Sequence, residues 1–172
     1  MTADELRALQ TPLKKKYKDQ PASALHVLKV EGRLSGDTVT CNVSTPRGEI
    51  EAGLHPATGG DGLSACSGDM LLEALVGCAG VTLRAVATAL AIPVRGGAVR
   101  AEGDLDFRGT LGVSKDVDIG FQAIRLYFDL DTDATPEQLE NLLKLTKRYC
   151  VIYQTLAKSP KLAEELKVSQ VA

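Results

Sequence analysis

The feature that most constrains this chain is the apolar stretch from Ser67 to Val94. Between Met70 and Ile92 it has no proline and only two charged side chains, Glu73 and Arg84. Such a segment is long enough to span a membrane, which takes about 20 apolar residues. However, charges inside the run would be costly in lipid, and no second hydrophobic segment or signal-like N-terminus accompanies it. We therefore expect a helix buried on nearly all sides in a soluble protein.

Two patterns within this helix bear on function. Glu73, Gly77, Gly80 and Arg84 recur at helical spacing, so they form one stripe with two opposite charges and two positions without side chains. This stripe is either a hydrated seam or a place where another helix approaches closely. Cys78 lies near the middle of the helix on another face, among small and apolar residues. A single cysteine in such surroundings is usually a small buried hydrophobe.

Composition limits the remaining possibilities. A chain of 172 residues with 44% hydrophobic residues forms one domain with a real core. The net charge of −2 argues against a nucleic-acid binder, and the basic run Lys14–Lys18 is typical of a solvated helix face. Four cysteines without a signal peptide indicate a reducing, cytoplasmic location. The chain has only seven aromatic side chains. A core so poor in aromatic rings, built around an apolar helix, favours a second subunit that covers the helix.

The order of periodic segments predicts an α+β domain over residues 1–172, with antiparallel sheets packed on the apolar helix. Residues 1–20 form an N-terminal helical extension, because Thr2 and Glu5 have the spacing of a capping box. A meander of three strands follows from Leu25 to Leu54, and its Cys41 faces the apolar side as a packing thiol. The remaining predicted elements are strands at 98–108 and 121–131, a helix capped by Thr135, a short helix from Pro160 and a terminal strand at 167–172.

The glycine-rich loop from Leu54 to Cys66 precedes the apolar helix. Its glycine spacing matches neither a P-loop nor a dinucleotide fingerprint, so the loop is a weak candidate for a phosphate-binding site. Cys66, Cys78, Cys150 and His55 are the only candidates for a metal site. They lack the C-x-x-C or H-x-x-H spacing typical of zinc ligands. We expect neither a metal nor a cofactor.

Two segments together resemble one family. ALVGCAGVTLRAVA around Cys78 and RYCVIYQTL around Cys150 are similar to the corresponding parts of the OsmC/Ohr family, which comprises osmotically inducible protein C and the organic hydroperoxide resistance protein. The similarity covers roughly Leu25 to Leu156. It implies the OsmC-like fold, an intertwined homodimer whose antiparallel sheets wrap around the long central helices. It also implies a thiol-dependent peroxidase.

The resemblance assigns a role to each of the two thiols. It implies that Cys78 is the peroxidatic cysteine, which a hydroperoxide oxidises to a sulfenic acid, and that Cys150 is the resolving cysteine, which forms a disulfide with it. This agrees with general thiol chemistry, because the thiolate is the nucleophile and a redox-active cysteine usually lies next to a resolving partner. Organic hydroperoxides are the expected substrates, because the residues around Cys78 are apolar. A dithiol of the thioredoxin or lipoyl type would return the pair to the reduced state.

The family also uses a glutamate and an arginine beside the first cysteine. Gly68 stands at the glutamate position here, and Asp69 follows one residue late. Arg33, Arg47 and His55 are the candidates for the cationic partner. This departure leaves open a second function, a non-catalytic OsmC-like dimer that binds a small apolar ligand and whose thiols are structural.

Overall fold

The computed structural model describes residues 1–34 and 36–168, and the apolar stretch forms its longest helix, α2, Ser67–Ala89. Cys66 precedes the first turn without a side-chain cap. The helix ends at Ala89 with Leu90 as its C-cap, because Ala91 adopts a positive φ of 52° and Pro93 cannot continue the ladder. The observed helix begins a few residues before Met70 and ends three before Ile92.

Helix α2 packs along one side only. Its buried residues recur three or four positions apart, as expected for one helical face; they are Leu75, Ala79, Leu83, Val86 and Ala87. On the opposite side Val81 is 73% exposed, and Glu73, Gly77 and Arg84 are also exposed. The expectation of burial on nearly all sides is therefore wrong for the single chain, whose own elements supply cover for one face.

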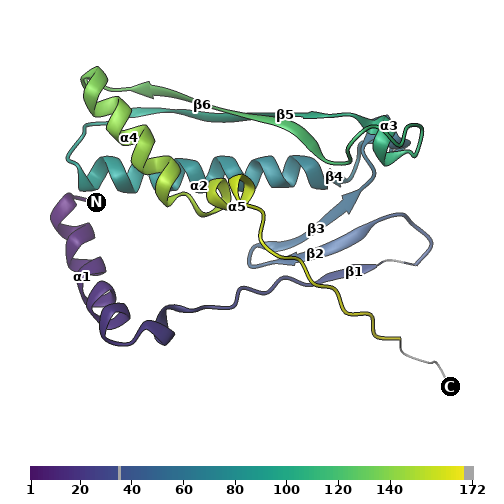
Figure 1. The fold of residues 1–172 in the computed structure, drawn as a ribbon, viewed down its shortest axis with the longest axis horizontal. Coiled ribbons are helices and arrows are strands. Elements are labelled where there is room, and N and C mark those ends of the chain that lie inside the picture. Colours follow the sequence, from purple (N-terminus) through teal and green to yellow (C-terminus); the bar gives the residue numbers. More distant parts are fainter. Residues whose placement is uncertain (35, 169–172) are drawn as a thin grey trace.

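The second sheet covers one side of α2 (Figure 1). Strands β5, Gly96–Leu105, and β6, Phe121–Asp131, pair antiparallel over their whole length. A short helix, α3, Phe107–Thr110, begins the connection between them. The predicted alternation is confirmed, because charged side chains line the outer face of the two strands and pair across them. Arg125 forms ion pairs with Glu102 and Asp104, and Arg95 with Asp131 and Asp133.

The first sheet has the predicted meander, with later boundaries. Its strands in order are β1, Gly32–Leu34; β2, Cys41–Thr45; β3, Gly48–Gly53; and β4, Ala65–Cys66. Residues 25–31, expected to begin a strand, lie outside β1, although the Glu31 carbonyl accepts a hydrogen bond from the Ser44 N–H of β2 at 2.9 Å. Strand β4 pairs parallel to β3, which the sequence pattern did not predict, and a 3₁₀ turn, Pro56–Thr58, lies between these two strands.

The helices at the two ends begin at the predicted caps. Helix α1, Ala3–Asp19, starts with a Thr2 capping box, and α4, Pro136–Tyr149, starts with a Thr135 and Gln138 capping box. A 3₁₀ turn, Pro21–Ala24, follows α1. Cys150 separates α4 from a further helix, α5, Val151–Ala157. No helix follows Pro160 as far as Val168, and the predicted terminal strand lies largely outside the described residues.

Together these elements place α2 at the centre of an α+β arrangement. Figure 1 shows β5 and β6 along one side of α2, α4 and α5 across another, and the first sheet extending away from it. Leu83, Val86, Ala87, Ile92 and Leu142 form the buried cluster between α2 and α4. Within the described residues α2 has the length and composition of a membrane span, yet it is also the packing centre of the fold. The predicted fold class is therefore confirmed.

Candidate functional site

Two cysteines meet where α5 packs against α2. Cys78 lies in the middle of α2 and is half-buried, whereas Cys150 lies between α4 and α5 and is 1% exposed. The two side chains are hydrogen-bonded to each other, and both are free thiols. The geometry therefore brings together the two thiols that the sequence motifs single out, although 71 other residues separate them along the chain.

The surroundings of Cys78 favour its thiolate. Partial burial raises the pKa of Cys78, but four hydrogen bonds act in the opposite direction and together lower it below the ordinary value. The donors are the backbone N–H groups of Ile152 and Val151, the Cys150 thiol and the Thr82 hydroxyl. Backbone N–H groups are available there because Cys150 supplies no side-chain cap to α5. A thiolate held by such donors is a better nucleophile than an ordinary thiol at neutral pH.

Cys150 has the opposite character. Burial raises the pKa of Cys150, and the neighbouring Cys78 raises it further by accepting a hydrogen bond from the Cys150 thiol and by its charge. The backbone N–H groups of Tyr153 and Ile152 offset only part of this effect. The pair is therefore polarised: Cys78 is the thiol that ionises more readily, and Cys150 is the one that holds its proton more firmly. In an arrangement of this kind an external oxidant such as a hydroperoxide can oxidise the first sulfur to a sulfenic acid, which the second sulfur then converts into a disulfide with loss of water.

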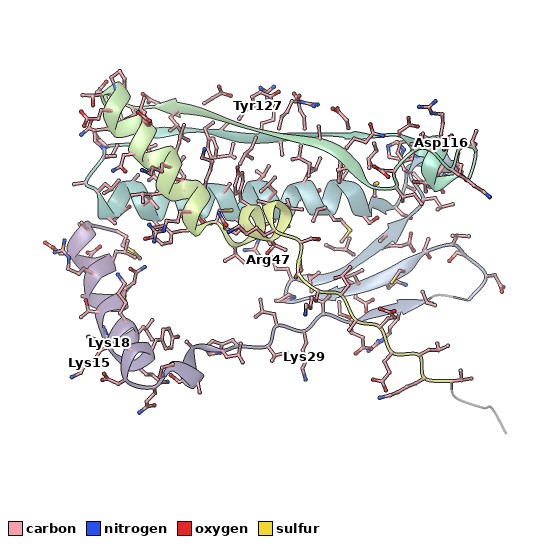
Figure 2. All side chains as sticks on the ribbon, in the orientation of Figure 1. Lys15, Lys18, Lys29, Arg47, Asp116 and Tyr127 are labelled. Atoms are coloured by element: carbon pink, nitrogen blue, oxygen red, sulfur yellow. The ribbon has the colours of Figure 1, made fainter. Side chains whose placement is uncertain are left out.

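Of the candidate supporting residues, the two arginines lie on the first sheet. Arg33 in β1 is exposed and pairs with Glu31, its Nε 3.3 Å from a carboxylate oxygen. Arg47 lies in the turn between β2 and β3, where its backbone N–H donates to the Thr45 hydroxyl at 3.2 Å (Figure 2). Neither side chain is among the groups of the described chain that shift the pKa of Cys78.

His55 and Asp69 also have other surroundings. His55 stacks on the Phe107 ring, with 4.9 Å between the ring centroids, and its Nδ1 accepts a hydrogen bond from the Ala57 N–H at 3.0 Å. Asp69 is exposed in the first turn of α2. Within the described residues neither contributes to the pKa of Cys78. The structure thus brings Cys78 and Cys150 together, and none of the four candidate supporting residues is among the described groups that shift the pKa of Cys78.

Thr82 is a site residue that the sequence analysis did not single out. It follows Cys78 by four positions, so the two side chains lie on the same face of α2, and this spacing was the available signal. Its hydroxyl donates a hydrogen bond to the Cys78 sulfur. Thr82 therefore contributes to the stabilisation of the thiolate.

The Thr82→Val substitution is expected to raise the pKa of Cys78, because it removes one donor and leaves the shape of the side chain nearly unchanged. The rate of Cys78 alkylation by iodoacetamide, measured against pH, should show its midpoint shifted upward. Hydrogen bonds to charged groups contribute about 1.5–3 kcal/mol, so the rate at pH 7 should fall by roughly tenfold or more. Thr88→Val, whose native hydroxyl bonds to the Arg84 carbonyl at 2.8 Å, is the control. An unchanged pH profile in Thr82→Val would contradict this role.

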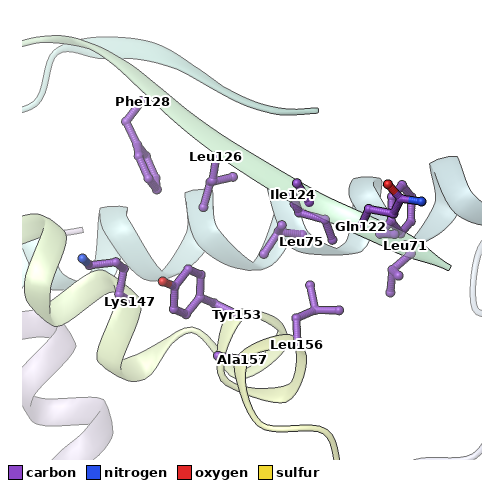
Figure 3. A pocket seen from close by; sticks show the side chains of 12 residues that line it. Leu71, Leu75, Gln122, Ile124, Leu126, Phe128, Lys147, Tyr153, Leu156 and Ala157 are labelled. Carbon is purple, nitrogen blue, oxygen red and sulfur yellow. The ribbon is translucent and has the colours of Figure 1, made fainter. Parts of the chain in front are cut away.

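An apolar pocket of about 610 Å³ lies between α2, β6 and the α4–α5 pair. In Figure 3 Leu126, Ile124 and Leu75 line its length, with Lys147 and Tyr153 at one end and Leu71 and Gln122 at the other. Leu71 lies two turns before Cys78 on the same face of α2. Small-molecule sites measure about 300–1,000 Å³, so the pocket can hold an apolar molecule beside the helices that carry the thiols.

Metal ligands are not assembled at this site. No group of three or more histidine, cysteine, aspartate or glutamate side chains in the described residues has the arrangement of a metal site. Cys66 lies on β4, and Cys41 lies on β2 next to Gly32, where an added Cβ would be 2.7 Å from its sulfur. Cys41 therefore packs against β1 but is only half-buried, which is less than the sequence predicted.

The fold and the site together define an α+β protein with a polarised thiol pair against a central apolar helix. The family described as OsmC-like protein matches residues 59–165, which is more than half of the chain. The chain therefore belongs to the OsmC-like family, and the resemblance drawn from its two cysteine segments is confirmed. No curated protein sequence matches the chain.

Solved structures show the same fold at low sequence identity. An OsmC-like protein from Mycoplasma pneumoniae has a TM-score of 0.65 and 15% identity, over 78% of this chain and 89% of that one. An organic hydroperoxide resistance protein from Elizabethkingia anophelis has a TM-score of 0.62 and 14% identity, over 78% and 91%. One from Legionella pneumophila has a TM-score of 0.61 and 14% identity, over 78% and 93%. These similarities establish the fold.

Proposed function

We propose that this protein reduces organic hydroperoxides with a peroxidatic Cys78 and a resolving Cys150. The observation that carries the proposal is the polarised pair itself, in which hydrogen bonds lower the pKa of Cys78 while Cys150 keeps its proton. Structural relatives named as organic hydroperoxide resistance proteins support the same chemistry. The proposed location is the cytoplasm, where dithiol reductants keep such a pair reduced.

The proposed reaction has three steps. The Cys78 thiolate attacks the distal oxygen of a hydroperoxide, the O–O bond breaks, and the alkoxide leaves as an alcohol after protonation. Cys78 is then a sulfenic acid. The Cys150 sulfur attacks the Cys78 sulfur, the S–OH bond breaks, and water leaves as the disulfide forms. A dithiol of the thioredoxin or lipoyl type restores both thiols by exchange, and is itself oxidised to a disulfide.

The product of one turnover without reductant tests this proposal. One equivalent of cumene hydroperoxide is expected to convert Cys78 and Cys150 into an intramolecular disulfide, because the two side chains are already in hydrogen-bond contact. Peptide mass spectrometry after alkylation of free thiols measures the disulfide, and Cys41 and Cys66 serve as internal controls that should remain alkylated. Overoxidised Cys78 beside a reduced Cys150 would remove Cys150 from the resolving role.

The proposed assembly is a homodimer in which a second copy covers the exposed side of α2. The stripe Glu73, Gly77, Gly80 and Arg84 is symmetric about the position between residues 78 and 79. Two antiparallel copies of α2 would therefore place Glu73 opposite Arg84 of the partner subunit, with the exposed Gly77 between them permitting close approach. Exposed apolar side chains elsewhere also need cover, including Leu28, 92% exposed, and Leu34, 88% exposed.

Charge reversal in this stripe tests the assembly. We expect a dimer for the wild type in sedimentation equilibrium, and weaker association for Glu73→Arg, which places like charges opposite each other. The double variant Glu73→Arg/Arg84→Glu should recover association, because it restores the opposite pairing. Glu140→Arg on α4, equally exposed, should have no effect. A monomeric wild type at micromolar concentration would contradict the homodimer.

The second candidate function is binding of a small apolar ligand without catalysis. The pocket between α2, β6 and α5 favours it, because the cavity is large enough for such a ligand. The two candidates differ in their dependence on sulfur chemistry. A ligand-binding protein would retain its function when Cys78 is replaced by serine, whereas the peroxidase would lose it.

A further inference from the structure

Thr146 carries a buried hydroxyl that the fold leaves without a partner. The residue is 1% exposed, and among the described residues its Oγ1 is the one fully buried side-chain oxygen or nitrogen without a hydrogen bond. Threonines within helices commonly donate to the carbonyl four residues back. Thr11 and Thr88 do so here, to the carbonyls of Arg7 and Arg84 at 2.7 and 2.8 Å. Thr146 makes no such bond.

The position of Thr146 relates it to the second thiol. The last turn of α4 closes when the Cys150 N–H donates to the Thr146 carbonyl at 2.9 Å. Side chains four residues apart in such a turn are neighbours on one face of the helix. Both side chains are buried to the same extent, at 1% exposure. The two side chains therefore lie on one face of α4, and both are shielded from solvent.

We propose that Thr146 is the positioning residue of the resolving thiol, and that its hydroxyl donates a hydrogen bond to the Cys150 sulfur as negative charge develops during disulfide formation. This inference deepens the proposed function, because it concerns the second step of the same chemistry. A buried unpaired hydroxyl destabilises the native state, and such groups are often retained for a catalytic or redox role.

The need for this donor follows from the change at Cys78. In the reduced pair the Cys150 thiol donates a hydrogen bond to the Cys78 sulfur, and the charge of Cys78 raises the pKa of Cys150. Once Cys78 has reacted, it no longer carries that charge, and Cys150 must lose its proton in order to attack. Burial opposes the Cys150 anion. A hydroxyl that is already desolvated can donate to this anion without first breaking another hydrogen bond.

A disulfide reagent tests the role without any peroxide. In a Cys41→Ser/Cys66→Ser background, Cys78 reacts with 5,5′-dithiobis(2-nitrobenzoate), releases one thionitrobenzoate and becomes a mixed disulfide. Cys150 then attacks the Cys78 sulfur, a second thionitrobenzoate leaves, and the Cys150 proton passes to the buffer. The absorbance of the second release reports the step in which Cys150 acts. Failure of the peroxidase proposal would leave this measurement intact.

Thr146→Val is expected to slow the second release by about fivefold to tenfold, with the first release unchanged. Thr146→Ser, which keeps the hydroxyl, should restore the rate. Thr88→Val is the matched control, because it removes a hydroxyl already paired with a backbone carbonyl. An unchanged second release in Thr146→Val would overturn the proposal. So would a Thr146→Ser variant that is as slow as Thr146→Val.

Thermal unfolding provides an independent readout. Thr146→Val replaces an unpaired buried hydroxyl by a methyl group of the same shape, so its Tm should rise by about 2–4 °C. The expected combination is a more stable protein with slower disulfide formation, which loss of structure could not produce. A variant with lower Tm and slower release would overturn the proposal, because the slower step would then follow from damage to α4. Thr146→Ala provides a second variant without the hydroxyl.

Discussion

Replacing Cys78 by serine is expected to reduce hydroperoxide consumption to the uncatalysed background. The serine hydroxyl keeps the size and the hydrogen-bonding neighbours of the thiol, but it remains protonated at neutral pH and does not reduce a peroxide. All other side chains of the site, including Cys150 and Thr82, are retained. The decay of cumene hydroperoxide in the presence of a dithiol reductant measures the effect, and the loss should be complete within the precision of the assay.

The chain offers a matched control for this experiment. Cys66 is also half-buried and precedes the same helix, but it stands outside the hydrogen-bonded pair. Cys66→Ser should therefore retain the full rate. Equal consumption by the wild type and Cys78→Ser would exclude the peroxidase and leave apolar ligand binding as the remaining function. A loss shared by Cys66→Ser would show that the assay responds to folding rather than to the thiol pair.

The largest expected effect on stability comes from Leu142→Ala. Leu142 is fully buried in the cluster formed with Leu83, Val86 and Ile92, where α4 packs on α2. Truncation removes transfer free energy and leaves a cavity, and such substitutions cost about 2–5 kcal/mol. The free energy of unfolding, measured in urea, should fall by that amount, with the m value unchanged.

The position of Leu142 connects this loss to the site. Helix α4 carries Thr146 and leads into Cys150, so the contact between α4 and α2 holds the resolving thiol against Cys78. Leu143, the next residue, is only half-buried and serves as the control, for which Leu143→Ala should cost less. Equal losses of unfolding free energy from the two substitutions would contradict the prediction that the buried cluster between α2 and α4 contributes most to stability.

The elements with strong local signals were predictable from sequence. The capping boxes at Thr2 and Thr135 set the starts of α1 and α4, because those hydrogen bonds involve residues three positions apart. The alternation along β5 and β6 was equally clear, since one face of that sheet meets water. The two cysteine segments indicated the family and the thiol pair through their residue types and order.

The activation of Cys78 could not be predicted in the same way. Its principal donors include the backbone N–H groups of Val151 and Ile152, and every residue other than proline has such a group. Their availability depends on a break between α4 and α5 at Cys150, which has no proline or glycine to mark it. The sequence candidates Arg33, Arg47 and His55 are side chains that can carry a positive charge, whereas the observed donors are uncharged. Likewise, the sequence showed that α2 is apolar, but not which of its sides its own chain covers.

Because of the break at Cys150, we expect the stability of the first turn of α5 to depend on the redox state of the Cys78–Cys150 pair. A helix N-terminus is normally capped by an oxygen of the preceding residue, but α5 receives its acceptor from Cys78 on another helix. The Cys78 sulfur thus takes the place of a capping oxygen for the first turn of α5. These hydrogen bonds are strongest while the sulfur is a thiolate. Oxidation to a disulfide removes this charge. We expect faster amide hydrogen exchange in the first turn of α5 in the oxidised protein, and equal exchange in both states would exclude this coupling.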